Sequence, residues 1–573
     1  MKKLLILFTA ILFLSCNKDG IIEQDMPVQP EIVLEGDGIY NIKVGRELEI
    51  APSYRNAEGA SYEWSIDGAI VCRQPRYTFV PESAGRVYID LKVSTSGGSA
   101  RESMRVEVAE LALPSVVLAG ADEGFVIATG STLEFRPVVA DSGLETLYKW
   151  SMRRPSGKNS DIVSEELAYT FAETDCGEYA MRFEAENEDG TESIEFAVSV
   201  VKAEDMPFAW SFLQTEYNIA KGRRIRIAPC AVSYGSEPEY VWTVDGREVQ
   251  RGDASAYIFT GEKEGAYTLK VTARSGKSVV SQELKINVCA AEGTYRRKAS
   301  AGSSARWSKV FEFTAAPGQF VNENYTATTA AEACAYAESR LKQKYYVSLG
   351  GFGGYIIVGF DHSIANTGGY DFAISGNSFD TSSEPGIVWV MQDENGNGKP
   401  DDTWYELAGS ESGSAETIRD YAVTYYRPSG SGMAVPWIDN RGNSGTIDYQ
   451  KAFHRQETYY PAWISADSYT LYGTCLKARN YQSGADWVQP PYDWGYVDNF
   501  SSVDRLSDDD NAEAVANPNH FKISNAIDFE GKSVKLEYID FIKVQTGVNA
   551  KSGWLGELST EVCDFYDYSL AKE

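Results

Sequence analysis

The chain has 573 residues, with 82 acidic and 53 basic side chains and a formal net charge of −29. This acidic surplus excludes nucleic-acid binding as the main role, because no cationic surplus exists to displace phosphate counterions. It suits a soluble surface protein with acidic cation sites. The length exceeds what one hydrophobic core can organise, so three to five domains are expected.

The first 16 residues form a targeting segment. Two lysines, Lys2 and Lys3, precede an apolar run that is too short to span a membrane as a mature helix. The run ends in Phe13-Leu14-Ser15-Cys16, which resembles a bacterial lipoprotein cleavage box. The resemblance implies cleavage before Cys16 and lipidation of its thiol. An ordinary secretory signal with an incidental cysteine is the alternative.

Residues 17–30 are polar, acidic and proline-containing, which predicts a flexible tether. Within it, Lys18-Asp19 resembles the signal that sends Bacteroidetes lipoproteins to the outer cell surface. The resemblance implies a surface-exposed protein of the outer membrane, attached through its N-terminal lipid only. No later segment approaches 18 consecutive apolar residues, so a lipid is the expected anchor.

An aromatic pattern occurs three times in the first half of the chain. Each copy has Tyr-x-Trp, then Tyr-x-Phe, then a glycine followed closely by a tyrosine. The copies begin at Tyr62, Tyr148 and Tyr240. This interval suits one immunoglobulin-sized sandwich per copy, with the tryptophan in the core between two sheets. The tyrosine after the glycine, Tyr88, Tyr179 or Tyr267, is expected to close the other side of each core. The pattern resembles PKD-like modules of bacterial surface proteins. We expect three Ig/PKD-like β-sandwiches at 31–110, 111–203 and 204–290, acting as a stalk.

Seven cysteines follow Cys16, widely spaced and without a CxxC motif, so a zinc site is not expected. Cys230 and Cys289 fall near the first and last strands of the third module. They could form a disulfide or remain as buried thiols, and the sequence leaves both open. The other five are expected in cores: Cys72, Cys176, Cys334, Cys475 and Cys563.

A basic, Ser/Gly-rich linker at 291–304 precedes a C-terminal domain, 305–573, of different character. Thr329 followed by Glu332 is a capping-box signature for one short helix. Later apolar and aromatic runs predict strands. The chain is therefore expected to be all-β, ending in a larger β-sandwich of the jelly-roll or galactose-binding-like type. The strands are expected at 356–360, 370–375, 387–391, 403–407, 421–426, 469–476, 521–527 and 538–546.

The segment 393–402, DENGNGKPDD, predicts a calcium loop between two strands. Oxygen-bearing side chains alternate along it, and Gly396 and Gly398 allow the backbone to curl. It resembles the first nine positions of an EF-hand-type loop, but Trp404 stands where a bidentate glutamate is expected. The candidate ligands are Asp393, Asn395, Asn397, the carbonyl of Lys399, Asp401, Asp402 and Glu406. A hairpin turn with solvated acids is the alternative.

Several motifs of this domain resemble a family of Bacteroidetes PKD-like cell-surface lipoproteins, most of them without an assigned activity. They include Gly353-Gly-Tyr-Ile-Ile-Val-Gly-Phe-Asp-His362, Glu384-Pro-Gly-Ile-Val-Trp-Val and Gly553-Trp-Leu-Gly-Glu557. Some relatives accompany outer-membrane uptake systems, including cobalamin uptake. The resemblance implies a context, and no catalytic residue follows from it.

Residues 453–500 are rich in aromatic side chains and poor in regular elements, which favours binding loops on a rigid sandwich. Sugar and corrin rings both stack on aromatics, so a glycan, a corrinoid or a partner such as an outer-membrane transporter is expected to bind there. The alternative is a small core belonging to the loop itself. The candidate residues are Tyr459, Trp463, Tyr481, Trp487, Tyr492 and Trp494.

Signatures of catalysis are weak. The chain has three histidines, no HExxH and no GxSxG motif. A glycoside hydrolase needs two carboxylates across a cleft, and among 82 acids such a pair cannot be located from sequence. Asp380, Glu384 and Glu406 are the candidates for cleft acids. We expect a binding protein and not an enzyme.

Overall fold

The computed structural model describes residues 28–141, 143–428, 430–506 and 517–571. The predicted signal segment, Cys16 and most of the tether lie outside these ranges. The chain divides into two compact units, one ending at Leu111 and the other running from Ala112 to the C-terminus. The first unit holds one sandwich. The second holds two further sandwiches together with the C-terminal domain, so only the first module is a unit by itself.

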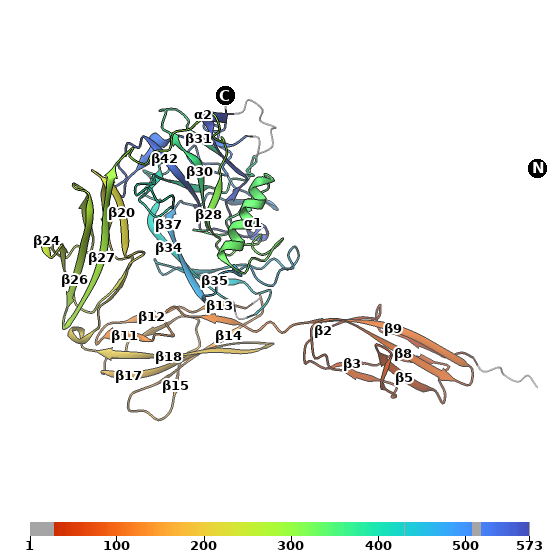
Figure 1. The fold of residues 1–573 in the computed structure, drawn as a ribbon. Helices are drawn as coiled ribbons and strands as arrows, with labels where there is room; N and C mark the ends of the chain where they lie inside the picture. The colour runs from red at the N-terminus through yellow and green to blue at the C-terminus, as the bar shows by residue number, and fades with distance from the viewer. Residues whose placement is uncertain (1–27, 142, 429, 507–516, 572–573) are drawn as a thin grey trace, which may run out of the picture. The chain divides into compact units, whose positions relative to one another are not determined.

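The first sandwich has two layers of antiparallel strands, closed at one edge by a parallel pair (Figure 1). Its five-stranded sheet has the order β2-β9-β8-β5-β6, with β2 parallel to β9, and the pairs β3–β7 and β1–β4 form the other layer. The strands are β1 Glu31–Val33, β2 Ile39–Lys43, β3 Leu48–Ile50, β4 Ser53–Arg55, β5 Ser61–Ile66, β6 Ala69–Cys72, β7 Tyr77–Phe79, β8 Gly85–Thr95 and β9 Gly98–Ala109.

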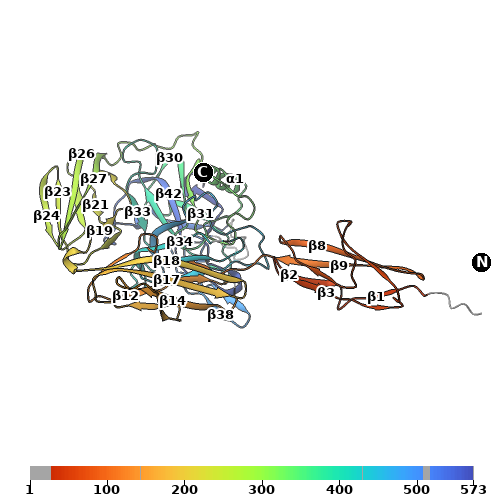
Figure 2. The same cartoon turned by 90° about the horizontal axis from the view of Figure 1, so that it is seen from below.

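The second and third sandwiches repeat this order strand for strand, as β11-β18-β17-β14-β15 and β20-β27-β26-β23-β24 (Figure 2). The second contains β10 Ser115–Val117, β11 Phe125–Ala128, β12 Leu133–Phe135, β13 Val138–Ala140, β14 Leu147–Arg153, β15 Asp161–Ser164, β16 Tyr169–Phe171, β17 Gly177–Asn187 and β18 Gly190–Val201. The third contains β19 Ala209–Ser211, β20 Glu216–Lys221, β21 Arg224–Ile227, β22 Ala231–Ser233, β23 Glu239–Val244, β24 Arg247–Gly252, β25 Tyr257–Thr260, β26 Gly265–Ser275 and β27 Ser278–Ala291.

The repeated tryptophans lie at the centres of the three cores, as the sequence pattern predicts. Trp64, Trp150 and Trp242 are fully buried. Each stands at a β-bulge against the neighbouring edge strand. The indole N–H groups of Trp64 and Trp150 donate to backbone carbonyls of the following segment, at 2.8 and 3.0 Å. The indole ring therefore fills the gap between the two sheets, and its N–H group supplies a hydrogen bond to a backbone carbonyl that follows the edge strand.

The tyrosine after the repeated glycine differs between copies. Tyr179 and Tyr267 lie two residues after Gly177 and Gly265, and each hydroxyl donates to the carbonyl four residues upstream. This is the tyrosine-corner arrangement of immunoglobulin-like domains. The prediction that Tyr88 closes the first core is wrong, since Tyr88 is 53 % exposed. It lies three residues after its glycine, and an odd offset places a strand side chain on the opposite face.

The C-terminal domain is built on a six-stranded antiparallel sheet of order β28-β30-β42-β32-β33-β41. A four-stranded sheet, β36-β35-β34-β37, a three-stranded sheet, β40-β31-β44, and two short pairs complete it. The strands are β28 Lys309–Thr314, β29 Val347–Ser348, β30 Tyr355–Ala365, β31 Phe372–Ser375, β32 Gly386–Met391, β33 Trp404–Leu407, β34 Ile418–Tyr426, β35 Val435–Asp439, β36 Ser444–Ile447, β37 Ser468–Cys475, β38 Tyr481–Ser483, β39 Asp486–Val488, β40 Asn519–Phe521, β41 Ala526–Ile527, β42 Tyr538–Thr546, β43 Glu561–Val562 and β44 Asp564–Asp567.

The central strand β32 is buried on both faces, as its two-sided apolar sequence indicates. Val388 and Val390 belong to the main core, whereas Ile387 and Met391 belong to two smaller clusters on the other face. Such burial on both faces gives near-continuous apolar runs. The loops that leave this strand are therefore held at their base by a rigid element.

The predicted helix is present as α1 Ala330–Lys342, which packs against β28 (Figure 1). The hydroxyl of its N-cap, Thr329, accepts from the amide of Glu332, and the Glu332 carboxylate accepts from the amide of Thr328. A second helix, α2 Tyr568–Ala571, was not predicted. The all-β class with tandem Ig/PKD-like sandwiches is confirmed, with these two helices in the described part of the chain.

One predicted strand, 521–527, is wrong as a single element. It divides into β40 and β41, separated by a 3-10 turn at Ile523–Asn525. A hydrogen bond to a buried carboxylate accompanies the end of the first strand, because the amide of Ile523 donates to Asp371 at 2.8 Å and does not pair with a neighbouring strand. The turn carries the chain from the three-stranded sheet to the six-stranded sheet.

Candidate functional site

The loop between β32 and β33 has the backbone curl that the calcium prediction requires. The amide of Asn397 donates to Oδ1 of Asn395 at 2.9 Å, and the amide of Lys399 donates to Oδ1 of Asn397 at 2.7 Å. The amide of Gly398 reaches back to Oδ2 of Asp393 at 3.0 Å. Gly396 and Gly398 have φ angles of 73° and 69°, a region open to glycine at little cost.

Four of the predicted ligand side chains come together in this loop. The carboxylate of Asp401 accepts from the side-chain amides of Asn395 and Asn397, at 2.9 to 3.1 Å. Asp393 is buried, and its Oδ1 has no hydrogen-bond partner. Burial raises the pKa of Asp393 above its ordinary value. A buried oxygen without a donor is costly unless a proton or a cation neutralises it.

Of the two acids proposed to complete the coordination, Asp402 lies in the loop and Glu406 lies on a strand beyond it. Asp402 accepts the amide of Glu394 with Oδ2 at 2.8 Å, and its Oδ1 is buried without a hydrogen-bond partner. Glu406, on β33, pairs with Trp389 on the neighbouring strand and accepts from the hydroxyl of Thr474 at 2.5 Å. Glu406 is therefore a buried hydrogen-bond acceptor of the sheet.

Glu394 is an acid that the sequence pattern did not single out. It is 4 % exposed, and neither carboxylate oxygen has a hydrogen-bond partner. Burial, and then the charge of Asp402, raise the pKa of Glu394 to about 8; burial raises that of Asp402 to about 7. In the EF-hand-type pattern Glu394 occupies an unassigned position, so only its burial could have identified it.

The loop also lies against the third sandwich. The side-chain amide of Asn218 donates to the carbonyl of Asp401 at 3.1 Å, and the hydroxyl of Thr403 donates to the carbonyl of Asn218 at 2.9 Å. Nearby, Arg223 pairs with Glu292 at 2.6 Å. The loop's shape is thereby tied to the junction between the third sandwich and the C-terminal domain.

The six aromatic candidates do not form one surface. Tyr459 and Tyr492 are buried, and their hydroxyls bond to the amide of Gln450 and the carbonyl of Lys477. Trp463 packs on the main core against Phe313. The three rings therefore pack into three different hydrophobic clusters of the domain, and they do not form a separate core of the loop.

Trp494 lines a cavity of about 250 Å³ elsewhere on the domain. Its other walls include Tyr370, His520 and Lys522, and the Lys522 ammonium lies 4.8 Å from the centre of the Tyr370 ring. The cavity therefore combines aromatic and cationic groups, yet holds only one of the predicted residues.

Tyr481 and Trp487 lie on the exposed hairpin β38–β39, next to a tryptophan that the sequence analysis did not select. Trp554 is 53 % exposed and Tyr481 is 52 % exposed. The indole N–H of Trp554 donates to the carbonyl of Ala485 at 3.4 Å, and a Cβ at Gly553 would lie 2.6 Å from Nε1 of Trp487. Trp487 and Trp554 therefore lie together although they belong to loops far apart in sequence, whereas Tyr481 pairs with Val488 and lies on the opposite face of the hairpin from Trp487.

Hydrogen bonds between loops hold this region in place. Asn480 donates to the Lys551 carbonyl and the Ser552 hydroxyl, both at 3.0 Å, and Gln489 donates to the same hydroxyl at 3.3 Å. Ser382 in turn donates to the side-chain carbonyl of Gln489 at 2.9 Å. We call Trp487 and Trp554 the aromatic loop surface; Tyr481, Phe379 and Phe453 are exposed on other parts of these loops and their neighbours.

All seven cysteines in the described ranges are free thiols. Cys230 lies 3.3 Å from the hydroxyl of Ser211, and Cys289 points to the carbonyl of Asn287. The two therefore take the thiol alternative in this structure. Cys475 and Cys563 are buried as expected, whereas Cys176 is exposed and is not a core residue.

Residues 29–95 match the PKD-like domain family. The chain is a PKD- and Ig-like β-sandwich protein. Domains of this type suggest a surface or binding role. No curated protein matches the chain. No helix in the described residues is long and apolar enough to cross a membrane.

Several solved structures resemble part of the chain. The I-band fragment I67–I69 of titin is 12 % identical, covers 46 % of this chain and 98 % of its own, and has a TM-score of 0.19. Three N-terminal domains of the outer capsid protein Hoc of bacteriophage RB49 are 13 % identical, with 45 % and 99 % coverage and a TM-score of 0.21. At such scores the likeness carries no argument, so the assignment rests on the strand order and the PKD-like match.

Proposed function

We propose that this protein is a cell-surface lipoprotein that binds a ring-bearing nutrient, a glycan or a corrinoid, through its C-terminal domain. The aromatic loop surface is the observation that carries the proposal. Aromatic side chains exposed together on hydrogen-bonded loops are costly to leave in water and mark interaction sites. The first sandwich, a unit by itself, would serve as a spacer between the lipid and the binding domain.

The chemistry of this surface suits a flat or ringed ligand. Trp554 and Trp487 offer rigid aromatic faces at low entropic cost, and polar groups such as Asn480 and Asp486 lie close to them in the same loops. A sugar ring would stack on the indole and hydrogen-bond to these neighbours. A corrin ring would use the same stacking over a larger area. The acidic net charge argues against phosphate-rich polymers.

The cellular setting is proposed from the sequence. The box that ends at Cys16 supports lipidation, and Lys18-Asp19 supports export to the outer surface of the outer membrane. Together with the PKD-like match, these features support membership of the Bacteroidetes surface-lipoprotein family that the C-terminal motifs resemble.

We further propose that calcium binds the curled loop and stabilises it. Asp393, Asn395, Asn397, the carbonyl of Lys399 and Asp401 would hold the ion. The donors fit, because all are oxygens and one is a buried carboxylate oxygen without a partner. A bound divalent ion would neutralise the acids and fix the junction with the third sandwich. The ion would have a structural role.

The test measures binding to the mature chain by isothermal titration calorimetry against a panel of bacterial and host polysaccharides and against cyanocobalamin. Trp554→Ala is expected to weaken binding by about 2 kcal/mol, roughly 30-fold, as for a central aromatic anchor. Tyr88→Ala is the matched control, because Tyr88 is equally exposed but lies in the first sandwich. Equal binding by both variants would overturn the assignment of this surface.

Other results of the binding experiment would support a different function for the protein. Absence of small-molecule affinity, with co-purification of an outer-membrane transporter, would support an accessory subunit or adhesin. Turnover of a glycan, abolished when one carboxylate is changed, would make the protein a hydrolase.

A further inference from the structure

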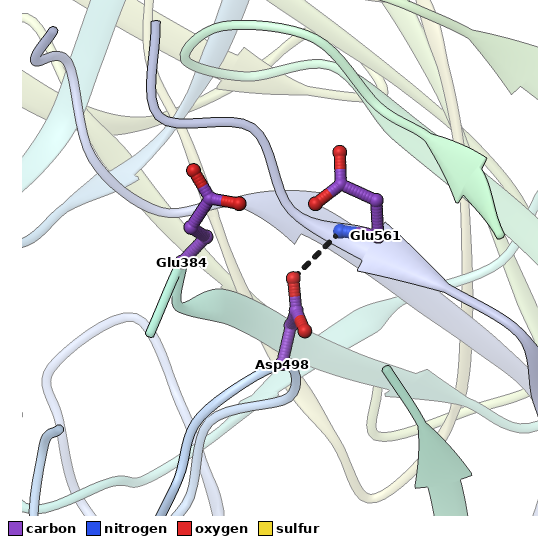
Figure 3. Close-up of side chains that lie close together, drawn as sticks. All are labelled: Glu384, Asp498 and Glu561. Atoms are coloured by element: carbon purple, nitrogen blue, oxygen red, sulfur yellow. Dashed lines mark hydrogen bonds between the residues drawn. The ribbon is translucent and has the colours of Figure 1, made fainter. Parts of the chain in front are cut away.

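Three carboxylates from distant parts of the sequence meet inside the C-terminal domain. Glu384 lies two residues before the start of β32, Asp498 lies between β39 and β40, and Glu561 begins β43. One oxygen of each lies within 4.8 Å of the others. Figure 3 shows the carboxyl groups of Glu384 and Glu561 facing one another, with Asp498 beside them. We call these three residues the carboxylate cage.

Backbone hydrogen bonds fix the cage. The amide of Glu384 donates to the carbonyl of Asp498 at 2.9 Å, and Gly386 and Val497 exchange both backbone bonds, at 2.9 and 3.1 Å. The amide of Glu561 donates to Oδ2 of Asp498 at 2.9 Å. The three side chains are thus presented by paired backbone segments, which hold ligands more firmly than free loops do.

The cage concentrates negative charge where water cannot screen it. Asp498 is 0 % exposed and Glu561 is 2 % exposed. Among the described residues, the ion pairs include none of the three carboxylates. Oε1 of Glu561 is buried and has no hydrogen-bond partner. Several kcal/mol per ion is the order of the cost of burying unpaired charges, so protons or a cation must neutralise them.

The details favour a cation. Both oxygens of Asp498 accept backbone amides, from Asn377 at 2.8 Å and from Glu561 at 2.9 Å, and these bonds favour its charged form, whereas burial raises the pKa of this carboxyl to about 7. Gly376 allows the backbone to approach this carboxylate closely, because a Cβ there would lie 2.5 Å from Oδ1 of Asp498. Glu384 is only partly buried, which gives an ion a path from solvent.

We infer that Glu384, Asp498 and Glu561 form a second cation site that takes a hard divalent ion of the calcium class. The donors are all oxygen, without the nitrogen or sulfur ligands that zinc prefers. The site lies apart from the loop at Asp393–Asp401 and does not depend on the function proposed above. Waters and backbone oxygens would complete the coordination.

The position of the cage gives the ion a structural consequence. The amide of Ser383 donates to the carbonyl of Gln489, and Gln489 in turn supports Ser552 next to Trp554. The cage thus lies at the base of the segments that carry the aromatic loop surface. A bound ion joins residues 384, 498 and 561 and stiffens that base.

The experiment titrates calcium chloride into the chelator-treated mature chain, in an Asp401→Asn background that weakens the loop. Glu384→Gln is expected to remove one equivalent of calcium, and to remove the calcium-dependent rise in Tm that this site contributes. Glu557→Gln is the matched control, because Glu557 is also a buried acid of this domain with an unbonded oxygen, and it is outside the cage. It is expected to retain calcium.

The competing arrangement is a proton shared between Glu384 and Glu561. In that case Glu384→Gln would leave calcium stoichiometry unchanged and raise Tm with or without calcium, which would overturn the inference. Glu561→Gln provides a second variant if the first folds poorly. If neither variant folds, the parent Asp401→Asn chain decides: one retained equivalent, seen also as bound Mn²⁺ by electron paramagnetic resonance, supports the site, and none refutes it.

Discussion

Replacing Gly398 with alanine tests whether calcium selects the curled form of the loop. Gly398 has a φ of +69°, and a Cβ added there would meet no atom within 4 Å. The substitution therefore changes backbone strain alone, which costs about 1–2 kcal/mol for a non-glycine residue in the left-handed region. Without the ion the exposed loop can uncurl to relieve this strain. Calcium must then restore the curl, so its affinity is expected to fall by about 5- to 30-fold.

Two further glycines calibrate the effect. Gly396→Ala should cost more, because its φ is +73° and its Cβ would lie 2.5 Å from the ring of Tyr295. Gly222→Ala is the control. Its φ is +89° with no atom within 4 Å, but it lies in the third sandwich. It should lower stability by a similar amount and leave calcium affinity unchanged.

The assay is terbium luminescence sensitised by the nearby Tyr295, with calcium as competitor. It uses a Glu384→Gln background so that the carboxylate cage does not contribute. If calcium displaces terbium from the Gly398→Ala and Gly222→Ala variants at the same concentration, the two bind calcium equally tightly, and the argument that the ion stabilises the curl is refuted. The alternative reading of this segment, a hairpin turn with solvated acids, would then stand.

Two further predictions concern stability. Trp64→Ala should lower the free energy of unfolding of the first sandwich by about 3–5 kcal/mol, because it leaves a cavity in the core and removes the donor to the Gln74 carbonyl. Tyr88→Ala should change this free energy by less than about 0.5 kcal/mol, because Tyr88 is exposed. Urea titration measures both, and equal effects would contradict the core assignment. The hydrogen bond to Asp567 raises the pKa of His362 above 6.5. The stability that the protonated His362 contributes is therefore complete below pH 6.5, and it declines by up to about 1.4 kcal/mol per pH unit as pH rises through the folded pKa. His362→Gln should flatten this slope in thermal unfolding from pH 5 to 9, and an unaltered slope would exclude this pair as its cause.

The three-fold repeat could be predicted from the sequence because it is a local pattern. Tryptophan, glycine and tyrosine recur at similar offsets, and a strand alternates its faces with a period of two. The same rule explains the error at Tyr88, where one extra residue after Gly85 reverses the face. Counting the offset from the glycine would have identified Val87 as the inward residue, and Val87 packs on the first core.

The residues of the candidate sites could be predicted only in part from the sequence. The curl of residues 393–401 could be predicted, because its ligands and glycines are close neighbours in sequence. The aromatic loop surface was half predicted. Trp487 was selected, but Trp554 lies far along the chain and reaches it only through the packing of two loops. Burial of Tyr459 and Tyr492 could not be separated from exposure by composition alone.

Sequence by itself determined the number of Ig/PKD-like sandwiches, the position of each core tryptophan, the capped helix and the curl of the loop at 393–401. All of these depend on residues within one element or one turn of each other. Only the tertiary structure decided which acids lose their water. Glu394 could be recognised only from its burial. Glu384, Asp498 and Glu561 meet because backbone segments separated by up to 177 residues pair with one another. Desolvation and charge repulsion depend on distance in space, and distance along the chain does not report it.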